Sequence, residues 1–145
     1  MNLSIIIPLY NEEESIGELN KRLKEVLVKL KINYEILYID DGSRDTSVKI
    51  LRTLSAQDEH LRIIELKRNF GKSIALAVGF EQVLGDLVVT MDADLQDDPG
   101  EIPRLIEKIN SGYDLISGWK YKRKDPFVKI LSSKIFNFTV SLLSG

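Results

Sequence analysis

Short apolar runs alternate with helical patterns along most of the chain. Each run is bounded by turn or helix signals, as is typical of buried strands. The runs cover residues 3–8, 35–40, 61–66, 86–91 and 113–117. Between them, apolar residues recur at three- and four-residue steps or dominate the stretch, which predicts helices that bury at least one face. These helices cover residues 16–30, 46–54 and 73–84, and a fourth begins near Pro99.

This alternation predicts an α/β fold, with a mainly parallel sheet and helices on both of its faces. Right-handed crossovers place the carboxyl ends of parallel strands along one edge of the sheet, where ligands bind in such folds. Polar clusters directly follow three of the predicted strands, at residues 10–12, 40–43 and 92–94. We therefore expect a binding site at this edge.

The most informative cluster is the acidic loop after the fourth predicted strand, VVTMDADLQDDP. Side chains alternate along an extended chain, so Asp92, Asp94 and Gln96 are expected to point the same way. Mg²⁺ and Mn²⁺ prefer oxygen ligands, and Mg²⁺ usually binds one or two carboxylates together with substrate phosphates. The loop therefore predicts a divalent-metal site for a nucleotide diphosphate. The alternative is an acidic turn in which Asp97 and Asp98 cap the next helix.

The cluster after the second predicted strand offers further carboxylates. Asp40 and Asp41 close this strand, where a carboxylate can accept hydrogen bonds from a base or a ribose. The alternative is a turn followed by a helix cap from Ser43 or Asp45, and both interpretations can hold together.

Two weaker signals surround these clusters. Tyr10 could lie against a planar base and Glu12 could bond to it, although Asn11 followed by glutamates also resembles a helix N-terminus. The segment LKRNFGKS lacks the spacing of a phosphate loop. Gly71 and Lys72 could still approach an anion at a helix start, but Lys72 is more readily interpreted as a surface charge.

Composition narrows the class of protein. A chain of 145 residues, 43% hydrophobic and 29% charged, can bury the core of one domain. Its net charge of −2 argues against nucleic acid as a partner. The lack of cysteine excludes disulfides, thiolate metal ligands and a cysteine nucleophile. The sequence shows no signal-peptide pattern and no membrane-spanning window, so we expect a cytosolic chain that can still touch a membrane.

The last stretch of the sequence differs in kind. Residues 120–134 contain six lysines and arginines against one aspartate. After Pro126, apolar residues recur at helical spacing. A basic segment with an apolar stripe suits an anionic membrane surface. The alternative is that the stripe packs on the rest of the protein.

Four motifs in sequence order resemble those of family 2 glycosyltransferases of the GT-A fold. They are SIIIPLYNEEESI, YEILYIDDGSRDTS, RNFGKSIALAVGF and GDLVVTMDADLQDDPGEIP. Within the family they are most similar to polyprenyl-phosphate sugar transferases, such as dolichol-phosphate mannose synthase and undecaprenyl-phosphate glucosyltransferases. The resemblance implies a Rossmann-like GT-A core over residues 1–118, C-terminally incomplete, followed by a membrane-interface segment over residues 119–145. It also implies an inverting, metal-dependent transfer of a sugar from a UDP- or GDP-linked donor to a polyprenyl phosphate.

The resemblance assigns roles to individual residues. The implied nucleotide-binding residues are Pro8, Tyr10, Glu12, Ile39, Asp41, Asp92 and Ala93. The implied ligands of Mg²⁺ or Mn²⁺ are Asp92, Asp94 and Gln96, and the two aspartates are the implied catalytic residues. Lys120 stands where the family often has arginine, and its single point charge makes it a weaker phosphate ligand than a bidentate guanidinium. Lys134 would lie near the lipid phosphate.

Three hypotheses about function remain open. The first is transfer to a polyprenyl phosphate at the cytoplasmic face of a membrane, where the acceptor is already ionised because its second pKa is about 6, so that no general base is needed. The second is transfer to a sugar hydroxyl in surface polysaccharide synthesis, which needs a base. The third is a nucleotide-binding fragment without turnover. The sequence indicates neither the sugar nor the oligomeric state.

Overall fold

The structure, a computed structural model, describes residues 2–118, and all its regular elements lie in a compact unit that ends at Tyr113. Four parallel strands form one sheet in the order β3-β2-β1-β4. The strands are β1 (Asn2–Leu9), β2 (Asn33–Asp40), β3 (Leu61–Glu65) and β4 (Leu87–Thr90). Strand β1 thus has β2 on one side and β4 on the other, so the direction of strand order reverses beside it. The carboxyl end of β1 is the switch point at which such sheets bind ligands.

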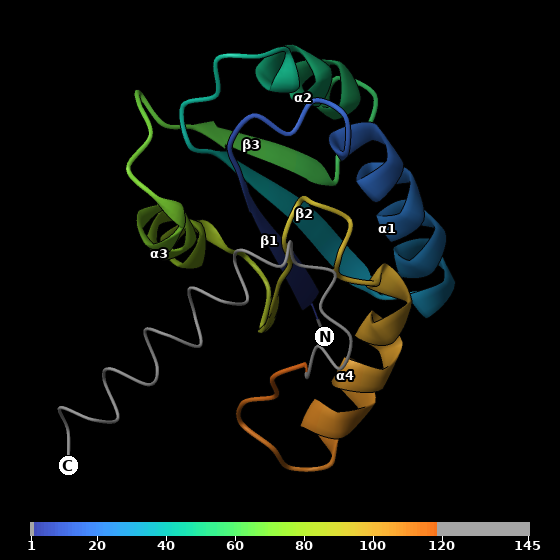
Figure 1. Cartoon of the computed structure of the whole chain (residues 1–145). Coiled ribbons are helices and arrows are strands. Elements are labelled where there is room, and N and C mark those ends of the chain that lie inside the picture. Colours follow the sequence, from blue (N-terminus) through green and yellow to red (C-terminus); the bar gives the residue numbers. More distant parts are fainter. Residues whose placement is uncertain (1, 119–145) are drawn as a thin grey trace, which may run out of the picture. The chain divides into compact units, whose positions relative to one another are not determined.

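Helices cover both faces of this sheet, as Figure 1 shows. One face carries α1 (Ile16–Leu30), α2 (Ser47–Ser55), the 3-10 turn η1 (Pro99–Glu101) and α4 (Ile102–Asn110), and the other face carries α3 (Lys72–Gln82). The predicted α/β fold is confirmed, and the first four strands and the helices begin and end within a few residues of their predicted bounds.

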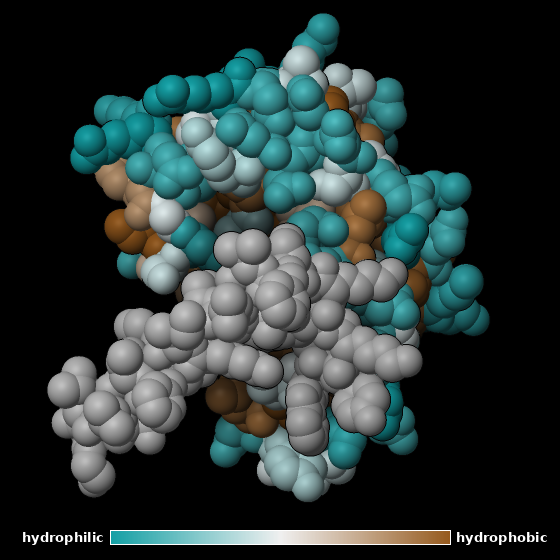
Figure 2. Space-filling model, in the orientation of Figure 1, coloured by the Kyte–Doolittle hydropathy of each residue, from teal (hydrophilic) through white to brown (hydrophobic). Residues whose placement is uncertain are grey.

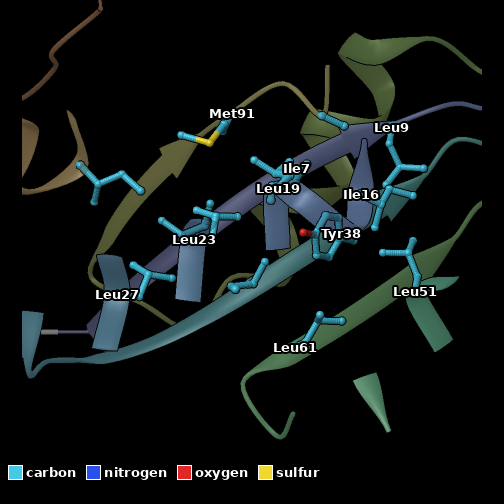
Figure 3. Close-up of a cluster of buried hydrophobic side chains, with 14 of the residues drawn as sticks. Ile7, Leu9, Ile16, Leu19, Leu23, Leu27, Tyr38, Leu51, Leu61 and Met91 are labelled. Atoms are coloured by element: carbon cyan, nitrogen blue, oxygen red, sulfur yellow. The ribbon is translucent and has the colours of Figure 1, made fainter. Parts of the chain in front are cut away.

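Period-two alternation along the strands creates two cores. Ile5 and Ile7 of β1 belong to the larger core with α1, whereas Ile6 belongs to the smaller core with α3. Figure 3 shows leucines of α1, including Leu19 and Leu23, lying against these strands. All of these side chains are buried, so burial of apolar surface fixes the register of the sheet.

The face of α3 that meets the sheet is made of small residues. A Cβ atom on Gly79 would lie 2.6 Å from Cγ2 of Ile6, so the glycine lets this helix approach β1 closely. Ala75 is buried in the same contact. The outer side of α3 keeps Ile74 and Phe80 exposed, and apolar surface is visible over this helix at the left of Figure 2.

The predicted fifth strand, residues 113–117, is wrong: this segment forms no strand and pairs with none of the four. Tyr113 and Leu115 are 60% and 86% exposed. An apolar pattern makes a strand only where a neighbour bonds its backbone groups, so the pattern by itself does not determine a strand. Within residues 2–118, no helix is long and apolar enough to cross a membrane.

Candidate functional site

The loops that follow all four strands meet around a pocket of about 280 Å³ at the carboxyl edge of the sheet. It is lined by seven of the predicted nucleotide and metal residues, namely Pro8, Tyr10, Glu12, Asp41, Asp92, Ala93 and Asp94. An adjoining pocket of about 330 Å³ shares Tyr10 and Asn69 with it. The convergence predicted from the strand ends is therefore present in the structure.

Reciprocal hydrogen bonds tie the loop after β1 to the loop after β2. The backbone N–H of Asn11 donates to Ser43 Oγ at 2.9 Å, and the backbone N–H of Arg44 donates to Asn11 Oδ1 at 2.8 Å. The N–H of Glu12 donates to Ser47 Oγ at 2.9 Å. Asn11 has a φ of 55° and α1 begins only at Ile16, so Asn11 does not cap this helix. These bonds hold Tyr10 and Glu12 at the pocket.

The loop after β3 is fixed by Asp41. Both of its carboxylate oxygens accept backbone N–H groups, from Phe70 and Gly71, each at 2.8 Å. Asp41 is only 3% exposed but lines the pocket. A carboxylate has about four lone-pair sites, so Asp41 keeps acceptor capacity for a ligand while it positions this loop.

Asp40 and its neighbours form the turn that was the alternative interpretation. Its carboxylate accepts the N–H groups of Gly42 and Ser43. Asp45 accepts the N–H of Ser47, the first residue of α2, but the cap position is Thr46, so the predicted cap from Ser43 or Asp45 does not lie at the cap position. Gly42 has a φ of 73°, and a Cβ on it would lie 2.5 Å from the carbonyl carbon of Arg68. The loops after β2 and β3 thus pack backbone against backbone.

The acidic loop after β4 is a turn and not an extended segment. Leu95 has a φ of 61°, and the N–H of Gln96 donates to Asp94 Oδ1 at 3.0 Å. Asp92 and Asp94 line the pocket but Gln96 does not, so the expected common direction of the three side chains is wrong, because alternation holds only for extended backbone. The metal role of Gln96 stays a prediction.

The two remaining aspartates of the acidic loop shape it. Asp97 accepts the N–H of Asp92 at 3.0 Å, and Asp98 accepts the N–H of Gly100 at 2.9 Å as the cap of η1. The capping role proposed for Asp98 is therefore confirmed. It does not exclude a ligand role for Asp92 and Asp94, because the caps and the pocket use different residues.

The donor set fits a metal ion that arrives with a phosphate ligand. No group of three or more His, Asp or Glu side chains among the described residues is arranged to hold an ion by itself. The acidic loop instead presents two carboxylates, Asp92 and Asp94, at one pocket. Mg²⁺ is typically bound in this way, through one or two carboxylates, waters and substrate phosphates.

The structure also brings residues to the pocket that the sequence interpretation undervalued. Lys72, the first residue of α3, lines the pocket and forms an ion pair with Asp92. Asn69 also lines it, although nothing in the sequence singled it out. The signal that could have found both is the position of their loop, directly after the third strand at the ligand-binding edge.

Three predicted residues lie elsewhere. Ile39 is wholly buried in the core under α3 and does not line the pocket. Lys120 and Lys134 lie outside the described residues, as does the predicted membrane-interface segment, residues 119–145. The roles of these residues stay predictions.

Comparison with known proteins decides the family. The model of "Glycosyl transferase family 2" matches residues 4–142. The chain belongs to this family. It is 42% identical, over 144 residues, to undecaprenyl-phosphate 4-deoxy-4-formamido-L-arabinose transferase of Pseudomonas fluorescens, and the match covers 99% of this chain and 42% of that protein. The family 2 chain therefore spans less than half the length of this relative.

Solved structures support the fold. S. aureus TarS 1–349 superimposes with a TM-score of 0.62 at 24% identity, and the match covers 87% of this chain and 38% of TarS. A mannosyltransferase from Pyrobaculum calidifontis, solved in complex with GDP-Man and Mn²⁺, gives a TM-score of 0.57 at 26% identity. That match covers 63% of this chain and 27% of the mannosyltransferase. The predicted GT-A fold is thus confirmed.

Proposed function

We propose that this chain is the donor-binding part of an enzyme that transfers a sugar from a nucleoside diphosphate sugar to a polyprenyl phosphate. The observation that carries the proposal is the pocket in which Asp92 and Asp94 meet Tyr10, Glu12 and Asp41 at the switch point of the sheet. The name of the Pseudomonas fluorescens relative supports a polyprenyl-phosphate acceptor. The mannosyltransferase solved with GDP-Man and Mn²⁺ supports the donor class and a divalent metal.

The donor would lie across the pocket from the β1 loop to the acidic loop. Tyr10 would contact the base with its ring, while Glu12 and Asp41 would accept hydrogen bonds from the base or ribose. Pro8 and Ala93 would form the apolar walls. Ile39 is wholly buried and does not line the pocket, so it would support this wall from beneath and not contact the base. Asp92 and Asp94 would face the diphosphate.

The acidic loop would hold Mg²⁺ or Mn²⁺, which when bound neutralises charge on the departing diphosphate. An oxygen of the lipid phosphate would attack the anomeric carbon as the bond to the nucleoside diphosphate breaks, so the configuration inverts. The acceptor is already ionised near neutral pH, and no residue need remove a proton. Lys120, Lys134 and the amphipathic segment would bring the protein to the cytoplasmic membrane surface, where its acceptor resides.

Calorimetry with UDP and GDP tests the donor half of this proposal. We expect one of them to bind in the presence of Mn²⁺, and chelation to abolish most of that affinity. If neither nucleotide bound in a metal-dependent way, the proposed donor site would be wrong.

A transfer assay tests the acceptor half, with labelled nucleotide sugars and undecaprenyl phosphate in anionic vesicles. Labelled lipid supports the proposal. Transfer only to a sugar hydroxyl would favour polysaccharide synthesis instead, and nucleotide binding without any transfer would identify a binding fragment.

A further inference from the structure

We propose that Lys72 is a specificity-determining residue of the donor site: it contacts the diphosphate, and Asp92 holds its ammonium group in place until the donor arrives. This inference rests on the proposed function and extends it. When the donor binds, the Lys72 ammonium would leave Asp92 and contact a phosphate oxygen. The Asp92 carboxylate would then bind the metal.

The ion pair itself does little for the stability of the fold. The side chains of Lys72 and Asp92 are 58% and 32% exposed, and both border the pocket. Exposed pairs of this kind contribute little to stability, since water screens them and two side chains lose freedom. Two charged groups that converge on a pocket without stabilising the core are better explained by a ligand.

The helix gains nothing from a lysine at this position either. Lys72 is the first residue of α3, where the macrodipole is positive and a cation is disfavoured. The first turn of α3 contains no acidic residue. The carboxylates that offset the positive charge here come from outside the helix, from Asp41 on the N–H of Gly71 and from Asp92 on Lys72. A helix N-terminus with a lysine beside it binds anionic groups, and a phosphate of the donor would take the place of Asp92.

The position of Lys72 is set by Asp41. The two hydrogen bonds from Phe70 and Gly71 to Asp41 fix the backbone directly before Lys72. Gly71 has a φ of 94°, a conformation that residues with a side chain rarely adopt, and it turns the chain into α3. The ammonium group is therefore presented by a rigid loop and not by a free surface segment.

The charges around the pocket bear on the ligand class. Four carboxylate residues line it, namely Glu12, Asp41, Asp92 and Asp94, so a divalent ion on Asp92 and Asp94 would leave no positive charge over for a diphosphate. Lys72 is the cation that lines this pocket in the described part of the chain. A lysine is a compact charge suited to phosphate oxygens. The geometry thus favours a nucleoside diphosphate over a nucleoside, and Lys72 supplies part of that preference.

The test compares Lys72→Met with Lys72→Arg and with Lys21→Met, a control that removes one exposed lysine on α1, away from the pocket. Calorimetry in Mn²⁺ measures the affinities for UDP and GDP, and displacement measures those for uridine and guanosine. Electron paramagnetic resonance measures binding of Mn²⁺ alone. Thermal unfolding of each variant checks the fold.

We expect Lys72→Met to weaken binding of the nucleoside diphosphate by about tenfold or more, as loss of a charge-assisted hydrogen bond does. The nucleoside affinity should not change, and binding of Mn²⁺ alone should tighten because Asp92 loses its competing cation. Lys72→Arg should keep most of the diphosphate affinity, and Lys21→Met should match the wild type.

Equal losses for nucleoside and diphosphate would mean that Lys72 only supports the loop, and this would overturn the inference. An unchanged diphosphate affinity in Lys72→Met would also overturn the inference. The proposed function would still stand in that case, because the wild type binds the nucleotide. If the wild type bound neither UDP nor GDP with Mn²⁺, the proposed function itself would fall.

Discussion

Two groups of polar side chains lie at opposite ends of the same sheet and differ in whether they border a pocket. Toward the amino edge, the 7%-exposed Glu35 accepts hydrogen bonds from Ser4 Oγ, the backbone N–H of Leu84 and Arg62 Nη1, each at 2.6 Å. At the carboxyl edge, Asp92 and Asp94 border a pocket. The Glu35 cluster is closed by the protein itself, whereas the carboxyl-edge cluster faces an opening.

We expect this difference to separate structural carboxylates from ligand-binding ones. Burial would raise the pKa of Glu35, but its hydrogen bonds from Ser4, Leu84 and Arg62 hold that pKa below the usual value. Such a group stabilises the fold only while every partner remains. A carboxylate at a pocket can instead be removed with little structural cost, because water replaces its partners. Mutations at the two edges should therefore separate stability from binding.

Asp94→Ala should have the largest effect on binding. We expect metal-dependent nucleotide affinity to fall on the order of a hundredfold, the upper end of the loss seen when even a residue that orients a metal ligand is removed. The melting temperature should change little, because Asp94 is exposed. Calorimetry in Mn²⁺ measures the first quantity and thermal unfolding the second. Asp98→Ala, which removes the cap of η1, is the control and should keep its affinity. A variant that bound as tightly as wild type would remove Asp94 from the metal site.

Glu35→Ala should show the opposite pattern. It leaves Arg62, Ser4 and the N–H of Leu84 without their acceptor, so we expect the free energy of unfolding to drop by about 2–3 kcal/mol. Urea titration measures this loss. Nucleotide affinity of the folded fraction should match the wild type, and a specific loss of affinity would contradict the separation of the two edges.

Glycines at each edge sharpen the same comparison. Gly42→Ala forces a Cβ into a backbone with a φ of 73°, 2.5 Å from the carbonyl carbon of Arg68. We expect a loss of stability of at least about 1–2 kcal/mol from the left-handed backbone alone, and also a weaker nucleotide affinity, because the loop before Lys72 must shift. Gly85→Ala places its Cβ 2.8 Å from the carbonyl oxygen of Asn2 at the amino edge. It should reduce stability but leave the affinity of the folded protein unchanged, and calorimetry on both variants distinguishes these outcomes.

The pH dependence of stability should show the smallest effect. Because the pKa of Glu35 is lowered in the folded state, its contribution is present above the usual value of 4.5 and is lost as the pH falls through the folded-state pKa. Urea titrations from about pH 6 to about pH 3 should show the free energy of unfolding falling in the wild type. The decline should be shallower in Glu35→Gln. Equal slopes would mean that Glu35 is not coupled to folding.

Much of the fold could be predicted because local pattern and tertiary burial agree. Ile5, Ile6 and Ile7 read as one apolar run, and the structure buries all three between two helical layers. The segment at residues 113–117 has a similar pattern but forms no strand. Pairing is a long-range property, and a short apolar run does not contain it.

The candidate site could be predicted only as far as the strand ends define it. Asp41 and Asp92 were found because polar residues follow buried strands. The predicted direction of the Gln96 side chain is wrong because Leu95, in the left-handed region, interrupts the extended backbone. The sequence does not indicate that Lys72 contacts Asp92. The two residues are twenty positions apart and meet only because of the crossover from β3 to β4.

The pocket draws on residues from Pro8 to Asp94, which span all four strands. No partly folded chain that lacks one of these strands can offer the complete set of contacts. A nucleotide that binds there selects the fully assembled unit and shifts the folding equilibrium toward it. At a ligand concentration one hundred times the dissociation constant, this linkage adds about 2.7 kcal/mol to the free energy of unfolding. The supply of a nucleotide that binds there would then regulate how much of the protein survives in the cell.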